Sequence, residues 1–155
     1  MKKNLNESIF QNISKNLIKN KIDIPINSIN IFKVDSDGNC YYRCLSQFLY
    51  DTPEKHPEFR NIIYQFCNSN KDVITEFQPQ VEIRNNTYMN TSEYIENIGK
   101  DKFWATDLEI SITSFILGIN IAVYKTKDNY NLKYLYSFIS NEDIKIPLLV
   151  LWNEN

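Results

Sequence analysis

The sequence is poor in glycine, histidine and cysteine, with three, one and three of these residues in a chain of 155. Three glycines leave no glycine-rich loop of the kind that holds a phosphate group. One histidine and the three cysteines Cys40, Cys44 and Cys67 form no cluster with zinc-ligand spacing, so we predict no metal and no cofactor. An odd number of cysteines favours reduced thiols inside a cell.

Long apolar runs are also missing. No stretch reaches the ~18 apolar residues that a membrane-spanning helix needs, and the polar N-terminus lacks the apolar core of a signal peptide. The sequence therefore predicts no membrane partner and an intracellular, cytoplasmic protein. The abundance of Asn, Ile and Lys indicates an AT-rich gene from a virus, symbiont or protozoan, so the expected location includes the cytoplasm of a host.

Charge is unevenly distributed, although the net charge is only −2. Residues 1–22 contain five lysines and one glutamate, whereas residues 23–155 contain 12 basic and 18 acidic residues. The acidic body argues against nucleic acid as the main partner and suits a protein partner with a basic tail. We expect a monomer.

The hydrophobic pattern changes from helical to strand-like along the chain. The basic segment 1–22 is predicted to form an amphipathic helix over roughly residues 5–20. Residues 24–26 are predicted as a connector, 29–34 as an extended run and 79–90 as a loop. Helices first and strands late predict an α+β fold in a single domain over residues 1–155. Further helices are predicted near residues 40–49, 57–70, 73–77, 91–98 and 104–117, and strands over 119–124, 132–138 and 144–152.

Residues 35–44 (Asp-Ser-Asp-Gly-Asn-Cys-Tyr-Tyr-Arg-Cys) combine a sharp turn with the start of a helix. Gly38 is a turn former, and apolar residues recur at helical spacing after it. Cys40 is therefore predicted in the first turn of a helix, where free N–H groups and the positive helix end lower a thiol pKa. The same N–H groups could hold the oxyanion of an acyl-transfer intermediate. Simple packing is the competing interpretation of this cysteine.

Residues 37–43 (Asp-Gly-Asn-Cys-Tyr-Tyr-Arg) resemble the Asp-Gly-Asn-Cys-Leu-Phe-Arg signature of the ovarian tumour (OTU) family of cysteine deubiquitinases. Residues 103–110 are similar to the family's Trp-Gly-Gly-x-x-Glu-Leu, with alanine and threonine in place of the glycines. Residues 144–155 are similar to the strand that leads to the family's catalytic histidine. The resemblance covers roughly residues 24–155 and implies a papain-like OTU cysteine protease fold, with helices packed on a small, mainly antiparallel sheet.

The resemblance implies a thiol protease that hydrolyses isopeptide bonds at the ubiquitin C-terminus, within the ubiquitin conjugation pathway. Cys40 would be the nucleophile, and Asp37 would shape the loop before it. The backbone amides of Gly38, Asn39 and Cys40 would form the oxyanion hole. The expected partner is ubiquitin or a ubiquitin-like modifier.

Four further residues are given roles by position. Arg43 is expected to be a structural hydrogen-bonding residue or to contact substrate. Trp104 and Trp152 are expected in the core or in the wall of a substrate groove. Glu109 is expected to form an ion pair on a helix surface.

The general base is the open question. The resemblance places the family histidine after the last strand, beyond Asn155, and makes His56 a noncatalytic histidine. A chain without that base is expected to turn over poorly. The alternative function is therefore a catalytically impaired pseudoenzyme, or a truncated domain, that binds ubiquitin or a related modifier. A different papain-like acyl transferase or peptidase is a third interpretation, which the block around Trp104 disfavours.

Overall fold

The structure is a computed structural model that describes residues 24–25, 27, 31–128, 131–138 and 149–153. The chain forms two compact units, Val34–Glu109 and Met1–Lys33 with Ile110–Asn155. The predicted helix over residues 5–20 lies outside the described residues.

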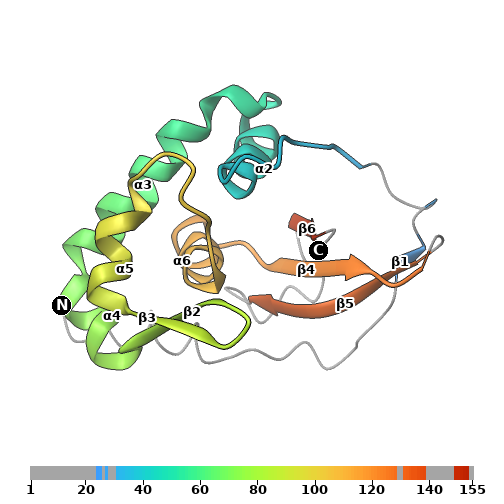
Figure 1. Cartoon of the computed structure of the whole chain (residues 1–155). Coiled ribbons are helices and arrows are strands. Elements are labelled where there is room, and N and C mark those ends of the chain that lie inside the picture. The colour runs from blue at the N-terminus through green and yellow to red at the C-terminus, as the bar shows by residue number, and fades with distance from the viewer. Residues whose placement is uncertain (1–23, 26, 28–30, 129–130, 139–148, 154–155) are drawn as a thin grey trace. The chain divides into compact units, whose positions relative to one another are not determined.

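The unit Val34–Glu109 is mainly helical, and α5 lies alongside α3 (Figure 1). Its buried apolar residues follow the helical spacing read from the sequence, as with Leu45 on α2 and Ile63 and Cys67 on α3. The helical spacing over residues 57–70 also predicts that Ile62 is buried, but its side chain is 49% exposed and lies off that buried face. The elements are α2 (Cys40–Tyr50), the 3-10 helix η2 (Pro53–Lys55), α3 (His56–Ser69), α4 (Lys71–Phe77), β2 (Gln80–Arg84), β3 (Thr87–Asn90) and α5 (Thr91–Ile98).

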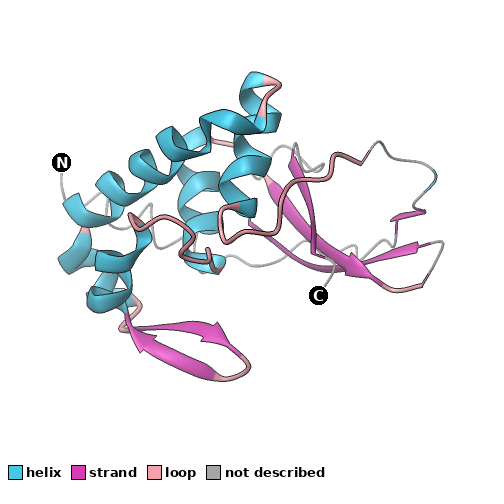
Figure 2. Cartoon of the chain, turned by 45° about the horizontal axis from the view of Figure 1, so that its top comes forward, coloured by secondary structure: helices cyan, strands magenta, loops and turns pink. Residues whose placement is uncertain are grey.

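The prediction of a loop over residues 79–90 is wrong, because β2 and β3 form an antiparallel hairpin there. Figure 2 shows this hairpin extending away from the helices of its unit. Val81 is buried between exposed neighbours, which is the alternation of a strand. Asn85 and Asn86 both have positive φ, of 45° and 61°, as a two-residue hairpin turn requires. The Asn-Asn pair was the available signal for this hairpin.

The N-cap of α5 also differs from the prediction. The sequence predicts Thr91 or Ser92 as the cap. Instead, Asn90 precedes the helix and its Oδ1 accepts the N–H groups of Ser92 and Glu93, at 2.9 and 3.4 Å. An asparagine side chain is an equally good acceptor at this position. The cap therefore lies at the last residue of β3, and the strand passes directly into the helix.

The other unit contains a four-stranded sheet with the order β1-β5-β4-β6. The strands β4 (Ile121–Thr126), β5 (Asn131–Phe138) and β6 (Leu149–Asn153) confirm the three predicted strands. β5 is antiparallel to both β4 and β1, whereas β6 is parallel to β4, so the sheet is mainly antiparallel as predicted. Helix α6 (Asp107–Leu117) precedes β4, and the α+β class is confirmed.

Two predictions near the N-terminus need correction. Part of the expected connector, Ile24–Pro25, forms the short strand β1. A proline fits there because β1 is at the edge of the sheet and need not donate to a further strand. The expected extended run continues into residues 31–34, which have no regular secondary structure.

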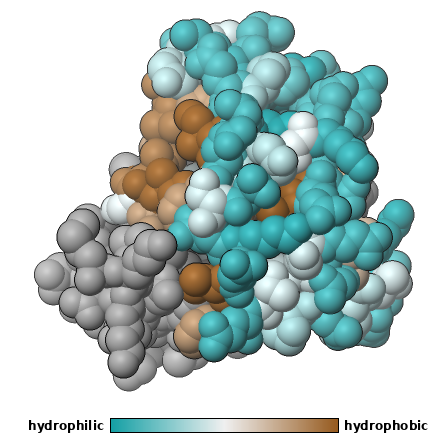
Figure 3. All heavy atoms as spheres, turned by 90° about the vertical axis from the view of Figure 1, so that its left-hand side faces the viewer, coloured by the Kyte–Doolittle hydropathy of each residue, from teal (hydrophilic) through white to brown (hydrophobic). Residues whose placement is uncertain are grey.

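The described surface is mixed in character. Figure 3 shows a face that is mostly hydrophilic, with hydrophobic side chains mainly on the left of the view and a few elsewhere. None of the helices in the described part of the chain has both the length and the apolar composition needed to cross a bilayer.

Candidate active site

Cys40 is the first residue of α2, as the sequence predicts, and its side chain is half-buried. Burial raises the pKa of the Cys40 thiol above its ordinary value, and the Asp37 carboxylate raises it further. The backbone N–H groups of Tyr41 and Cys40 lower this pKa, but by less. The expectation of a lowered thiol pKa is therefore wrong, because desolvation outweighs the helix N-terminus. A raised pKa disfavours the thiolate, so we expect activation of this thiol to need a base.

Gly38 gives the loop before Cys40 its shape. Its φ is +84°, a conformation that side chains strongly disfavour. A Cβ at this position would lie 2.1 Å from the carbonyl oxygen of Lys102. The loop and the backbone at residue 102 are thus in contact, and only glycine fits between them.

Asp37 and Arg43 form an ion pair that closes this loop onto α2, with 2.9 Å between Oδ2 and Nη2. Arg43 holds the pKa of the Asp37 carboxyl well below its usual range. Asp37 Oδ1 also accepts the backbone N–H of Asn39 at 3.0 Å, which makes an Asx turn. This hydrogen bond argues against an oxyanion role for the Asn39 amide and leaves Gly38 and Cys40 as the predicted donors.

Arg60, on α3, is a site residue that we did not predict. It is 5% exposed, and its guanidinium donates to the Gly38 carbonyl at 3.0 Å and to Asn39 Oδ1 at 2.7 Å. The available signal was its spacing: Arg60 precedes Ile63 and Cys67 by three and seven residues, which puts it on the buried face of α3. A charged residue in a buried stripe needs hydrogen-bond partners, and here the loop supplies them.

His56 is the first residue of α3 and does not have the surroundings of an oriented base. Burial, followed by the positive charge of Arg43, lowers its pKa. Its Nδ1 is buried and has no hydrogen-bond partner within the described part of the chain. A catalytic histidine normally has that nitrogen held by a third group.

The predicted tryptophans lie in different units. Trp104 is 54% exposed, so the prediction of a core role for it is wrong, and its carbonyl accepts the Tyr94 hydroxyl at 3.3 Å. Trp152 lies on β6, opposite Tyr124 of β4. A groove role for either tryptophan stays a prediction.

Glu109 is fully buried, so the prediction of a surface ion pair for it is wrong. Its carboxylate accepts the Tyr94 hydroxyl at 2.8 and 2.9 Å, and its Oε2 accepts the N–H of Thr106 at 2.9 Å. Thr106-x-x-Glu109 is the capping-box spacing, the sequence signal that points to this role. Burial raises the pKa of Glu109 to about 7, because the carboxylate loses its hydration.

Glu109→Gln is expected to remove a pH dependence of stability. A carboxyl with a pKa of about 7 when folded and an ordinary value of 4.5 when unfolded stabilises the fold only while protonated. The parent should therefore lose about 3 kcal/mol of unfolding free energy relative to the variant as pH rises from 4.5 through 7. Urea unfolding at pH 5, 6, 7 and 8 measures this difference. A parent-to-variant difference that is the same at every pH would contradict the burial of Glu109.

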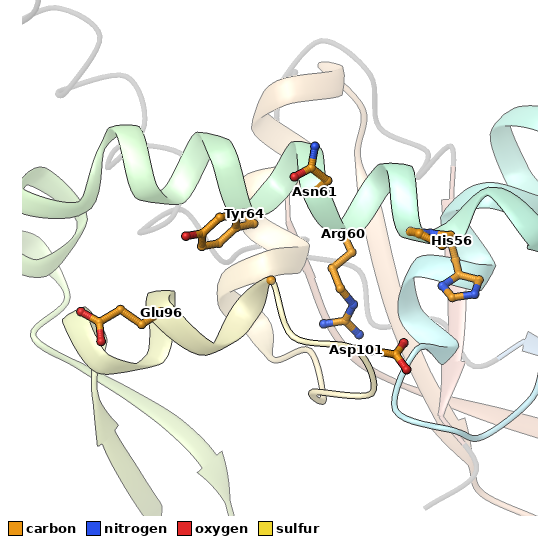
Figure 4. Close-up of a pocket in the computed structure, with 8 residues that line it drawn as sticks. His56, Arg60, Asn61, Tyr64, Glu96 and Asp101 are labelled. Carbon is orange, nitrogen blue, oxygen red and sulfur yellow. The ribbon is translucent and has the colours of Figure 1, made fainter.

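A pocket of about 400 Å³ lies between α3, α5 and the segment after α5. Asp101 in that segment also contacts Asn39, in the loop before Cys40. In Figure 4, Arg60 extends from α3 toward the segment that carries Asp101, and Glu96 projects from α5. The residues that line this pocket are His56, Pro57, Arg60, Asn61, Tyr64, Glu96, Gly99 and Asp101. Among the residues that the structure describes, no group of three or more histidine, cysteine, aspartate or glutamate side chains could hold a metal ion.

A cysteine at a helix N-terminus behind a glycine turn is the arrangement expected of a cysteine-dependent acyl-transfer site. The family of OTU-like cysteine proteases matches residues 35–154. The chain therefore belongs to this family, as its resemblance predicted.

Individual relatives are more distant. OVARIAN TUMOR DOMAIN-containing deubiquitinating enzyme 7 of Arabidopsis thaliana is 25% identical over 97 residues, 63% of this chain and 24% of that protein. OVARIAN TUMOR DOMAIN-containing deubiquitinating enzyme 10 of the same plant is 25% identical over 123 residues, which are 79% of this chain and 32% of that protein. This chain thus spans about a quarter to a third of the curated relatives that it matches.

Solved structures agree on the fold. The viral OTU domain protease of Qalyub virus has a TM-score of 0.61 at 20% identity, covering 79% of this chain and 77% of that chain. The Hazara virus OTU, solved bound to ubiquitin, has a TM-score of 0.59 at 17% identity, covering 79% of this chain and 74% of that chain. The papain-like OTU fold is therefore confirmed.

Proposed function

We propose that this chain is a thiol-dependent hydrolase that cleaves isopeptide bonds at the C-terminus of ubiquitin, with Cys40 as the nucleophile. The observation that carries the proposal is the loop before Cys40, in which Gly38 has positive φ and Asp37 pairs with Arg43. This loop puts a half-buried thiol and backbone N–H groups at one helix N-terminus, the two components that acyl transfer to a thiol requires.

The reaction has two steps. The Cys40 sulfur forms a bond to the carbonyl carbon of the terminal glycine, the carbon–nitrogen bond breaks, and the lysine amine leaves with the thiol proton. Water then adds to the thioester, the carbon–sulfur bond breaks, and a carboxylic acid and the free thiol are released, after which the acid loses its proton to solvent. The amides of Gly38 and Cys40 would hold the carbonyl oxygen while it carries negative charge.

A second candidate function is favoured by the raised pKa of Cys40 and by the surroundings of His56. Without a base the same fold would bind ubiquitin, or a ubiquitin-like modifier, and not cleave it. Binding and reactivity are separable: Cys40→Ala removes the nucleophile and should leave affinity for ubiquitin intact.

A ubiquitin probe with a C-terminal alkyl bromide tests the proposal. We expect the parent to gain one ubiquitin on Cys40, with a rate that rises from pH 7 to 9 as the thiolate fraction increases, because the pKa of this thiol is raised. Mass spectrometry of the product locates the adduct.

Two variants and a second probe complete this test. Cys40→Ala should abolish the adduct, whereas Cys44→Ala should keep it, because burial raises the pKa of Cys44 to about 11. A parent that binds ubiquitin tightly but never reacts would favour the pseudoenzyme. Reaction only with a probe made from another modifier would reassign the partner.

A further inference from the structure

We propose that Arg60 is a positioning residue that fixes the oxyanion loop, residues 37–40, by tying it to the segment after α5. This inference rests on the proposed function and deepens it. Arg60 contacts this loop from α3, twenty or more residues further along the chain. The conformation of the loop therefore depends on a distant residue as well as on its own local contacts. The bonded residues all belong to the unit Val34–Glu109.

The guanidinium joins three segments of the chain. Its Nη2 donates to the Gly38 carbonyl at 3.0 Å and to the Phe103 carbonyl at 3.0 Å, and its Nη1 donates to the Ile98 carbonyl at 2.8 Å. The guanidinium also lies over the ring of Tyr42, 4.2 Å from its centre, which holds the donor plane in one orientation. Arg60 thus links the oxyanion loop to the end of α5 and to the segment that follows it.

The peptide unit between Gly38 and Asn39 is fixed at both ends. Arg60 holds its carbonyl, and Asp37 accepts its N–H at 3.0 Å. Because a peptide unit is planar, fixing both groups fixes the direction of the chain on either side. The amides of Gly38 and Cys40, the predicted oxyanion donors, flank this unit, and its fixed plane restricts the positions that they can take.

The Asn39 side chain makes a second link to the same segment. Its Oδ1 accepts from Arg60 at 2.7 Å and from the Lys102 N–H at 3.1 Å, and its Nδ2 donates to Asp101 at 3.0 Å. Gly38 meanwhile lies against the Lys102 carbonyl, which leaves no space for the loop to move that way. Arg60 and Asn39 together hold the loop against residues 98–103.

Lysine could not replace Arg60 in this arrangement. Arg60 bonds four acceptors that lie in different directions, three carbonyls and one amide oxygen, through a planar group. Nη2 bonds three of these acceptors, and Nη1 bonds the fourth, the Ile98 carbonyl. An ammonium group has its donors on a single atom and cannot span both positions. Arg60→Lys keeps the positive charge but removes the planar set of donors. It therefore separates the effect of hydrogen-bond geometry from the effect of charge.

Two ubiquitin probes distinguish a positioning role from a general structural one. With a C-terminal aldehyde, the Cys40 sulfur adds to the carbonyl carbon, and the oxygen gains the electron pair and then a proton to give a thiohemiacetal. That oxygen needs the oxyanion hole. With an alkyl bromide, the sulfur forms a bond to carbon and bromide leaves, with no oxyanion. The ratio of the two reactivities reports the hole. It cancels the fraction of folded protein and any displacement of the Cys40 sulfur, because both reactions depend on these equally.

For Arg60→Lys we expect the ratio of aldehyde affinity to bromide labelling rate to fall on the order of tenfold or more. A small displacement of an N–H donor removes much of its stabilisation of the oxyanion. Asp101→Ala, at an exposed position, removes only one link and should lower the ratio less. Ile74→Ala, a buried position on α4, lowers stability without touching these bonds and should leave the ratio unchanged.

An unchanged ratio in Arg60→Lys would overturn the inference, as would an equal fall in Ile74→Ala. If Arg60→Lys does not fold, Asp101→Ala tests the inference in its place, and an unchanged ratio in that variant overturns the inference. A parent that reacts with neither ubiquitin probe, while iodoacetamide still alkylates Cys40, would instead refute the proposed function.

Discussion

Gly38→Ala is expected to slow the labelling of Cys40 by the ubiquitin alkyl bromide on the order of 100-fold. The new Cβ would lie 2.1 Å from the Lys102 carbonyl oxygen, and the residue would also have to keep a φ of +84°. The loop must move to relieve this contact, and a displacement of about 1 Å at a reacting group can cost 10²-fold. Labelling rates of parent and variant, measured at one pH, give the effect.

Gly118→Ala is the matched control for this substitution. Gly118 also has positive φ, +64°, but a Cβ there would meet nothing within 4 Å. It should cost on the order of 1 kcal/mol of stability from backbone strain and leave the labelling rate unchanged. Equal labelling by Gly38→Ala and the parent would mean that the loop conformation is not needed for reaction.

Turnover of ubiquitin chains by these 155 residues is expected to be on the order of 10³-fold or more below that of a cysteine hydrolase with its histidine in place. His56 is the single histidine of the sequence, and its Nδ1 lacks a hydrogen-bond partner among the described residues. Alkylation needs only the thiolate, whereas cleavage also needs a group that protonates the leaving amine. We therefore expect slow labelling together with very weak cleavage.

The two activities are compared with the same preparation, by mass spectrometry for labelling and by gel for cleavage of ubiquitin dimers. Cys40→Ala should abolish both, and His56→Ala should change neither. Strong cleavage that disappears in His56→Ala would make His56 the base. That result would leave the Cys40 assignment intact and revise only the source of the proton.

The nucleophile helix and the late strands could be predicted because their signals are local. Cys40 does begin α2, and β4, β5 and β6 fall where short apolar runs predicted them. The hairpin of β2 and β3 was missed because its strands are short and mostly exposed, so alternation is visible at Val81 and little else. Its Asn-Asn turn was the stronger signal.

Buried polar residues were the main failure of prediction. Glu109 was expected on a surface and Arg60 was not singled out, yet both are buried and hydrogen-bonded. A charged residue in a predicted helix is expected to face solvent unless its hydrogen-bond partner is known. Here the partners of both residues lie on other elements of the chain. Tyr94 holds Glu109 from α5, and the loop at residues 38–39 holds Arg60.

The sequence by itself determined the family, the class of fold and the place of Cys40 at the start of a helix, because a contiguous motif and hydrophobic periodicity carry that information. Tertiary structure decided the direction of the pKa shift at Cys40 and supplied the long-range contacts that hold the oxyanion loop. Burial raises that pKa against the helix N-terminus, and desolvation depends on what packs around the thiol. The loop is held by Arg60 and by the backbone at residue 102, 21 and 63 residues from Asn39 along the chain. Such contacts exist only once distant segments have come together.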